Sequence, residues 1–237
     1  MYQPKVDTGC GAARYMPEVE TAVESGYTGA MKQTWRFMTL ADSGEKLLYG
    51  VLFAYFAYDF SSTFLAEPNL VTGLYLADQT IVMLFLLFRR PAQQISTRPL
   101  DYPVAAAGTL LPLLATPPSG APVAPILLLV VLAMAGLMLH LGAKLSLRRS
   151  FGIVAADRGI KIEGPYRFVR HPMYLGYIMV QLALLLAGPT LWNAVIFPLT
   201  WLMLVLRISA EERLLSQNDD YRAFQATTRF RLIPGLY

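Results

Sequence analysis

Residues 125–147 read PILLLVVLAMAGLMLHLGAKLSL, a run whose only ionisable side chains are His140 and Lys144. A helix needs about 20 residues to cross a hydrocarbon core of about 30 Å. The run meets that length without help from its neighbours. It therefore predicts a membrane-spanning helix, and the rest of the chain can be read around it.

Five further apolar stretches surround this run, and they are 47–66, 72–88, 102–116, 173–188 and 190–208. The first and the last reach spanning length, whereas the other three need flanking residues or a tilt. The chain of 237 residues is 55% hydrophobic and only 15% charged, whereas soluble domains carry about a quarter charged residues. We therefore expect an all-α fold, a polytopic membrane helical bundle with about six transmembrane segments.

The chain divides into three expected parts. Residues 1–46 are polar and predict a cytoplasmic N-terminal extension. Residues 47–124 hold the first transmembrane hairpins, and residues 125–237 form a C-terminal core that ends in a charged tail.

The positions of the basic residues predict the orientation in the membrane. With six crossings, one side receives residues 1–46, 89–101, 144–172 and 207–237, and these hold all 20 Lys and Arg residues of the chain. The opposite loops hold none. Because Lys and Arg are enriched in cytoplasmic loops, both termini are expected in the cytoplasm of an inner or plasma membrane protein. The same pattern explains the net charge of +4 without a nucleic-acid partner, which we do not expect.

Polar residues gather where the fifth apolar stretch begins. Residues 164–176 read GPYRFVRHPMYLG. Pro172 suits the first turn of a helix, where its missing N–H has no partner in any case. His171 and Tyr174 are three residues apart and share a helix face, and Gly176 leaves the backbone open to close approach. Polar groups at a membrane boundary are costly to desolvate, so this element predicts a site.

Two adjacent carboxylates, Glu211 and Glu212, follow the sixth apolar stretch. Arg207 lies four residues before Glu211 and can pair with it, whereas Glu212 points about 100° away on a helix. We therefore expect Glu212 to be the carboxylate that is freer to meet a cation. By itself such a pair is equally typical of a solvated helix end, so the hypothesis of a site depends on its combination with His171 and Tyr174.

In combination, these elements resemble the isoprenylcysteine carboxyl methyltransferase family, which groups with phospholipid N-methyltransferases. The resemblance covers about residues 125–237, and three elements carry it: Arg170-His171-Pro172-Met173-Tyr174-Leu175-Gly176, Glu211-Glu212 and Arg231-Leu232-Ile233-Pro234-Gly235. It implies an integral membrane enzyme that transfers a methyl group from S-adenosylmethionine to a lipid or isoprenoid amphiphile.

The resemblance also implies roles for individual residues on the cytoplasmic side of the C-terminal half. The residues expected at the cofactor are Tyr166, His171, Pro172, Tyr174, Gly176, Glu211 and Glu212. Arg170 and Arg207 would face the acceptor's head group. A carboxylate acceptor would need an arginine to position it, whereas an amine acceptor would need a base, for which Glu212 or His171 is the candidate.

Two other functions are compatible with parts of the pattern. Membrane sterol and steroid reductases, which use NADPH, share a similar His-Pro-x-Tyr-x-Gly element, but an acidic residue is expected there after the glycine, and this chain has Tyr177. A transporter or assembly factor would require ionisable residues near mid-membrane in several segments. A metal site is not expected, because two histidines and the single Cys10 lack ligand spacing.

Overall fold

The computed structural model describes residues 43–44, 46–88, 98–147 and 164–235. The chain falls into two compact units, residues 1–47 and 48–237, and the second is described here. The predicted N-terminal extension over 1–46 lies mostly outside the described residues, as does most of the polar stretch over 144–172. The predicted division at residue 124 stays a prediction.

Every regular element of the described residues is a helix, which confirms the all-α prediction. A first helix covers residues 46–66. The elements that follow are α2 (Leu70–Phe88), α3 (Asp101–Leu110), η1 (Leu111–Leu114), α4 (Ile126–Leu147), η3 (Gly164–Arg167), α5 (Pro172–Ala187), α6 (Leu191–Leu215) and α7 (Asp219–Thr227).

Three of the described helices, α2, α4 and α6, are long and apolar enough to cross a membrane. Helix α5 has 16 residues and is about 24 Å long at 1.5 Å per residue. The stretch 102–116 differs most from expectation, because it forms a helix of 10 residues followed by a 3₁₀ turn of four. Pro112 in that turn has no N–H to continue an α-helix. The count of six crossings stays a prediction.

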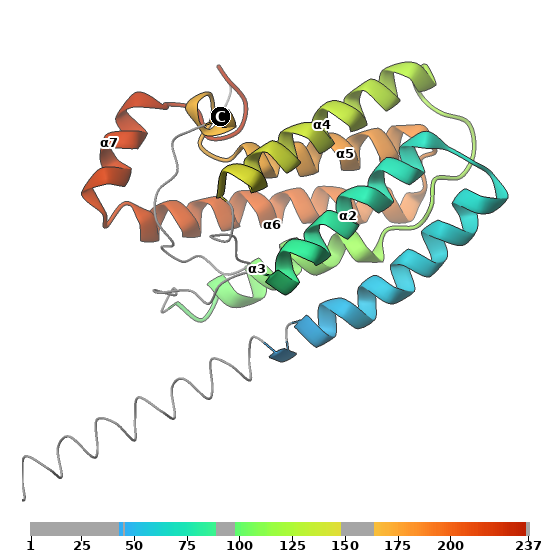
Figure 1. The fold of residues 1–237 in the computed structure, drawn as a ribbon, viewed down its shortest axis with the longest axis horizontal. Helices are drawn as coiled ribbons and strands as arrows, with labels where there is room; N and C mark the ends of the chain where they lie inside the picture. Colours follow the sequence, from blue (N-terminus) through green and yellow to red (C-terminus); the bar gives the residue numbers. More distant parts are fainter. Residues whose placement is uncertain (1–42, 45, 89–97, 148–163, 236–237) are drawn as a thin grey trace, which may run out of the picture. The chain divides into compact units, whose positions relative to one another are not determined.

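Helices α4 and α5 lie side by side (Figure 1) and approach closely at two glycines. A Cβ atom added to Gly176 would lie 2.7 Å from the carbonyl oxygen of Gly136 and 2.8 Å from the backbone nitrogen of His140. Small residues at such a crossing let two helix backbones approach, which is a common way to pack helices in membranes.

The loops without Lys or Arg lie together at one end of this unit. In Figure 1 the turn before α2, the loop before α4 and the turn between α5 and α6 are at the same end, opposite α7. Hydrogen bonds join two of them: the amide of Ser119 donates to the carbonyl of Gly188 at 3.3 Å, and that of Val123 donates to Leu186 at 2.9 Å. The fold thus groups the loops that the charge pattern assigns to one side.

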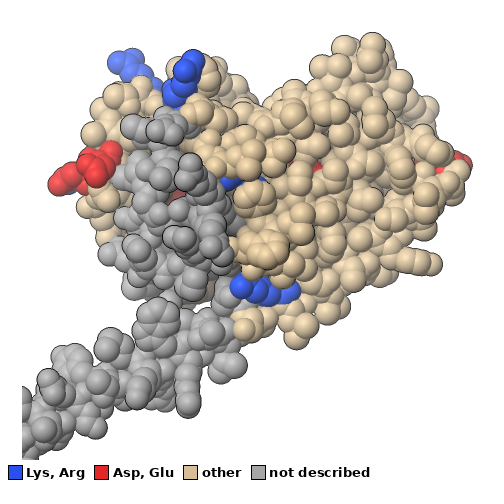
Figure 2. Space-filling model, viewed as in Figure 1, with Lys and Arg blue, Asp and Glu red and all other residues tan. Residues whose placement is uncertain are grey.

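The outer surface of the helices is largely apolar. Leu127 on α4 and Leu191 on α6 are 70% and 91% exposed, and many other large hydrophobic residues are also exposed. On the face drawn in Figure 2, Lys and Arg are absent from the end where α2 begins and occur toward the end that holds α7. A broad apolar belt is expected of a surface that lies in lipid.

Candidate active site

The site is built where α5 begins and α6 ends, and the C-terminal segment closes it. His171 is the N-cap residue of α5, and Pro172 occupies the first turn, as predicted. The backbone N–H groups of Arg170 and His171 donate to the carbonyls of Phe230 and Arg231 at 2.9 and 2.8 Å. These bonds fasten the Arg-Leu-Ile-Pro-Gly ending to the loop before α5, so the sequence elements behind the resemblance meet in space.

Glu212 is surrounded by cationic or potentially cationic groups. Its Oε1 accepts from Nε of Arg170 at 2.7 Å and lies 3.2 Å from Nε2 of His171. Its Oε2 accepts from Nε of Arg231 at 2.8 Å. The residue is buried, with 4% of its surface exposed. The expectation that Glu212 is the freer carboxylate is therefore wrong, because the tail folds back and brings Arg231 to it.

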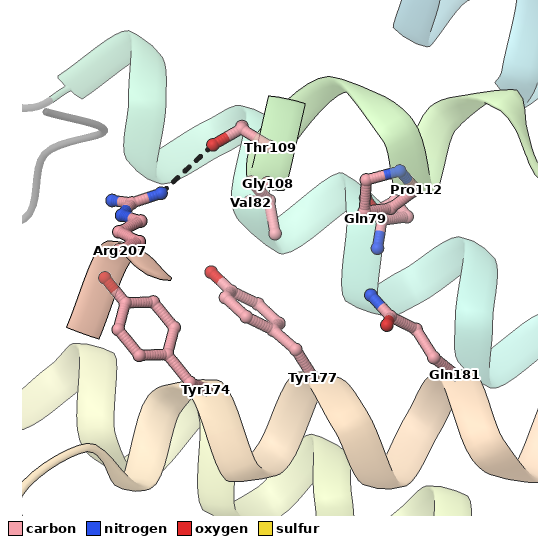
Figure 3. A pocket seen from close by; sticks show the side chains of 9 residues that line it. All are labelled: Gln79, Val82, Gly108, Thr109, Pro112, Tyr174, Tyr177, Gln181 and Arg207. Carbon is pink, nitrogen blue, oxygen red and sulfur yellow. Dashed lines mark hydrogen bonds between the residues drawn. The ribbon is translucent and has the colours of Figure 1, made fainter. Parts of the chain in front are cut away.

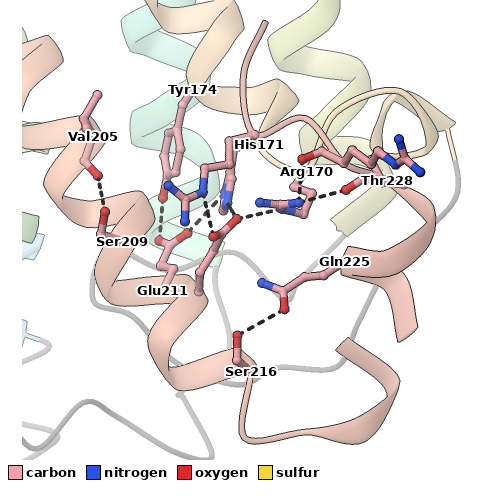
Figure 4. A network of polar contacts seen from close by, with 12 residues as sticks. Arg170, His171, Tyr174, Val205, Ser209, Glu211, Ser216, Gln225 and Thr228 are labelled. Atoms are coloured by element: carbon pink, nitrogen blue, oxygen red, sulfur yellow. Dashed lines mark hydrogen bonds and ion pairs between the residues drawn. The ribbon is translucent and has the colours of Figure 1, made fainter. Parts of the chain in front are cut away.

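Arg170 lies inside the same network, drawn in Figure 4. Besides its bond to Glu212, its Nη1 donates to the backbone carbonyls of Thr228 and Arg229 at 2.9 and 2.8 Å. All of these partners are groups of the protein itself, on α6 or in the C-terminal segment. The geometry thus gives Arg170 a role in holding the C-terminal segment, which differs from the expected contact with an acceptor head group.

Glu211 faces a different set of groups. Its Oε1 accepts from the hydroxyl of Tyr174 at 2.5 Å and from Nε of Arg207 at 3.1 Å. Its Oε2 lies 3.9 Å from Nδ1 of His171. The side chain is 18% exposed, compared with 6% for that of Glu212. Glu211 is therefore the more accessible carboxylate, and the predicted pair of Glu211 with Arg207 is confirmed.

Aromatic rings form one wall of this region. The rings of His171 and Tyr174 are stacked, with centroids 5.7 Å apart, and the guanidinium of Arg207 lies 5.3 Å from the centroid of the Tyr174 ring. Tyr166 on η3 is buried against the same cluster of side chains. Burial, followed by the charge of Glu211, raises the pKa of Tyr166 well above its ordinary value, so its hydroxyl stays protonated.

Gly176 has a different environment from the one predicted. Its open side faces α4, where Gly136 and His140 fill the space next to it. What approaches this glycine closely on its open side is therefore a neighbouring helix, which gives Gly176 a packing role, and its expected place at the cofactor stays a prediction.

A pocket lies at the level of the apolar helices, next to Glu211. The pocket is small, and Figure 3 shows its lining: Gln79, Val82, Gly108, Thr109, Pro112, Tyr174, Tyr177, Gln181 and Arg207. Nη1 of Arg207 donates to Oγ1 of Thr109 at 3.2 Å at one end of the pocket. Arg207 and Tyr174 therefore belong both to this wall and to the network around Glu211.

Three polar residues that line the pocket were not predicted from the sequence, and they are Gln79, Thr109 and Gln181. They come from α2, α3 and α5, three elements far apart in the chain. The available signal was the presence of a polar side chain within each of three apolar stretches. That signal does not say that the three side chains face one cavity.

A second buried polar group joins α2 to α4. Nδ1 of His140 pairs with Oδ1 of Asp78, and both side chains are fully buried. The pair thus links two neighbouring helices inside the bundle. Within the described part of the chain, no three His, Cys, Asp or Glu side chains are arranged to hold a metal ion.

Residues 123–217 match the isoprenylcysteine carboxyl methyltransferase (ICMT) family. This family consists of membrane methyltransferases, and the match covers 95 of the 237 residues. The matched segment contains α4, α5, α6, His171 and both glutamates, and it ends before Arg231. A search of curated proteins found no match. The resemblance inferred from the sequence is thus confirmed for the segment that carries most of the candidate site, and an enzyme is shown in place of a transporter or assembly factor.

Proposed function

We propose that this protein transfers a methyl group from S-adenosylmethionine to the carboxylate of a lipid-like or isoprenoid amphiphile at the cytoplasmic face of the membrane. The observation that supports this most directly is that Arg207 and Tyr174 line the membrane-level pocket and also contact Glu211. A cofactor beside Glu211 and an acceptor in the pocket would then meet at these two side chains.

The residues around Glu211 suit the charges of the cofactor. S-adenosylmethionine carries a sulfonium and an ammonium group, which are attracted to carboxylates and to aromatic faces. Glu211 offers an accessible carboxylate, and the stacked rings of His171 and Tyr174 offer aromatic surface beside it. Tyr166, His171, Tyr174 and Glu211 are therefore the residues that would hold it. When bound, it supplies an electrophilic methyl group, and its sulfur leaves as a neutral thioether.

A carboxylate acceptor agrees with the groups that the pocket presents. Arg207 is permanently charged, and its planar guanidinium matches the two oxygens of a carboxylate. Such an acceptor already has the lone pair that forms the new carbon–oxygen bond, so no proton has to be removed. Anion and cation become neutral products, which a site shielded from water favours.

An amine acceptor would need a base to remove its proton, and the candidate bases of this site are already engaged in contacts. Both oxygens of Glu212 already accept hydrogen bonds from arginines. His171 is also engaged, because its Nε2 lies 3.2 Å from Glu212. These contacts favour O-methylation over N-methylation.

The site's end of the unit is proposed to face the cytoplasm. This orientation follows from the grouping of all 20 Lys and Arg residues in the segments that are expected on one side of the membrane. Single cysteines at Ser119 and Ser150, in a Cys10→Ser background, would test this with a membrane-impermeant thiol reagent on intact cells. We expect labelling at position 119 and none at 150 until the cells are opened. Equal labelling at both positions would overturn the orientation.

The cofactor is tested by thermal unfolding of the purified protein in detergent. A ligand present at 100 times its Kd stabilises a protein by about 2.7 kcal/mol. We expect S-adenosylmethionine and its demethylated product to raise Tm, and NADPH to leave it unchanged. Stabilisation by NADPH alone would contradict the proposed cofactor.

The reaction itself is tested with a labelled methyl donor. Long-chain carboxylic acids and long-chain amines of equal length are offered to the protein in lipid nanodiscs. We expect label in a base-labile methyl ester and none in the amine. Label in the amine alone would show N-methylation and refute the proposed acceptor.

A further inference from the structure

Two buried carboxamides line the part of the pocket farthest along α5 from Tyr174. Gln79 and Gln181 are 2% and 1% exposed, and they come from α2 and α5. Tyr174, Tyr177 and Gln181 follow one another at spacings of three and four residues, so they share one face of α5. Seven residues of helix place Gln181 about 10 Å from Tyr174.

The contacts of Gln181 fix the direction of its amide. The indole nitrogen of Trp201, which can only donate, bonds to Oε1 of Gln181 at 2.7 Å. The amide nitrogen of Gln181 is thereby turned toward the pocket. Among the residues that the structure describes, this nitrogen has no hydrogen-bond acceptor.

Gln79 presents the same kind of group from the other side. Its Nε2 donates one N–H to Oδ2 of Asp78 at 3.2 Å, and Asp78 is held in turn by His140. In Figure 3 the amide nitrogens of Gln79 and Gln181 are turned toward each other. Two donors therefore converge on one point at a depth where the helices are otherwise apolar.

Such an arrangement is costly unless an acceptor completes it. An amide N–H that is turned into a largely apolar pocket without a hydrogen-bond partner destabilises the protein. Leucine at either position would fill similar space at no such cost. A pocket built only for hydrocarbon would therefore have no use for two facing donors.

We infer that the acceptor is an amphiphile with two polar points. Its anionic head lies at Arg207 and Thr109, and a carbonyl or ether oxygen on its chain accepts hydrogen bonds from Gln79 and Gln181 about 10 Å deeper. The inference rests on the proposed function, because it takes the pocket to be the acceptor site. It adds a substrate class, oxygen-bearing lipid acids, and names two residues that select it.

The test uses long-chain fatty acids of one length that carry a single keto group at successive positions, together with the unsubstituted acid. We expect kcat/KM for methyl ester formation to peak at one keto position, about tenfold above the unsubstituted acid, as one or two hydrogen bonds predict. In Gln181→Leu and Gln79→Leu this ratio should fall toward one. Because a ratio is measured within each variant, loss of folded protein does not affect it.

Gln225→Leu is the matched control. It makes the same exchange on α7, where Gln225 accepts a hydrogen bond from Ser216, and it should keep the wild-type ratio. A flat series in the wild type, with all acids methylated, would overturn the inference and leave the proposed function standing. So would a peak that survives in both pocket variants.

If cofactor binds but no acid is methylated, the proposed function fails, and the inference is decided by binding. Thermal stabilisation by the keto acids is then compared with that by the plain acid. A preference lost in Gln181→Leu supports a two-point pocket, and equal stabilisation refutes it.

Discussion

Glu211 and Glu212 are neighbours in the chain but belong to different regions of the molecule. Glu212 lies in a closed network with Arg170, His171 and Arg231 that ties the C-terminal segment to α5. Glu211 lies in an open one, where its partners Arg207 and Tyr174 also line a pocket. A network whose members bond only to one another stabilises the fold, whereas a network that borders a pocket can also contact a ligand. Adjacent residues of one type can thus have separate tasks.

The largest effect is expected when Arg207 is removed. Arg207→Ala leaves Glu211 without its arginine partner and the pocket without its positive end. Truncating one member of a buried charge pair costs about 2–5 kcal/mol, so kcat/KM for the acceptor should fall at least about thirtyfold. Steady-state methyl-transfer assays with the acceptor and the cofactor varied separately measure it.

Two further variants refine this test: Arg207→Lys conserves the charge, and Arg222→Ala is a surface control. Lysine keeps the charge but loses the planar fork, so it should recover only part of the activity if a carboxylate is held by two oxygens. Arg222 pairs with Asp219 at the surface, and its loss should change little. Full activity in Arg207→Ala would remove Arg207 from the site.

The two glutamates should separate when each is replaced by glutamine. Glu212→Gln leaves Arg170 and Arg231 beside a neutral group, and breaking a buried pair costs about 3–5 kcal/mol. We expect a clear fall in Tm. Glu211→Gln should lower Tm less and weaken binding of the demethylated cofactor more, as titration calorimetry on folded protein would measure. The reverse ranking of affinities would restore the sequence-based prediction that Glu212 meets the cofactor.

Gly176→Ala tests whether this glycine serves packing. The added methyl group would lie under 3 Å from two backbone atoms of α4, and overpacking costs about 1–3 kcal/mol. Tm should fall, while cofactor affinity per folded molecule should stay near that of the wild type. Gly50→Ala is the control, because its nearest neighbour is the end of Met83 at 3.5 Å. Loss of affinity without loss of stability would return Gly176 to the cofactor site.

The smallest effect is expected at Tyr166. Its pKa is raised in the folded protein, so the unfolded chain loses this proton first as pH rises. Its contribution to stability is therefore complete below about pH 10, the ordinary value for tyrosine, and declines above it. Tyr166→Phe should flatten the alkaline fall of the free energy of unfolding slightly, as urea titrations at pH 9 to 11 would measure. An unchanged slope would contradict burial of this hydroxyl.

The sequence by itself determined the membrane class and the helical fold. Apolar runs of spanning length can be read from single segments, because lipid requires each helix to satisfy its own backbone. The start of α5 was also predictable, since Pro172 acts on its own turn. The same holds for the pair of Arg207 with Glu211, which lie one helical turn apart.

Only the tertiary structure decided which residues that lie far apart in the chain become partners. Arg231 reaches Glu212 because the tail folds back over α5, and Gly176 meets Gly136 because α4 crosses at that point. Gln79, Thr109 and Gln181 line one pocket although α2, α3 and α5 supply them separately. Helical spacing fixes which side chains share a face of one helix. It does not fix which faces meet, because that depends on how all the helices pack together.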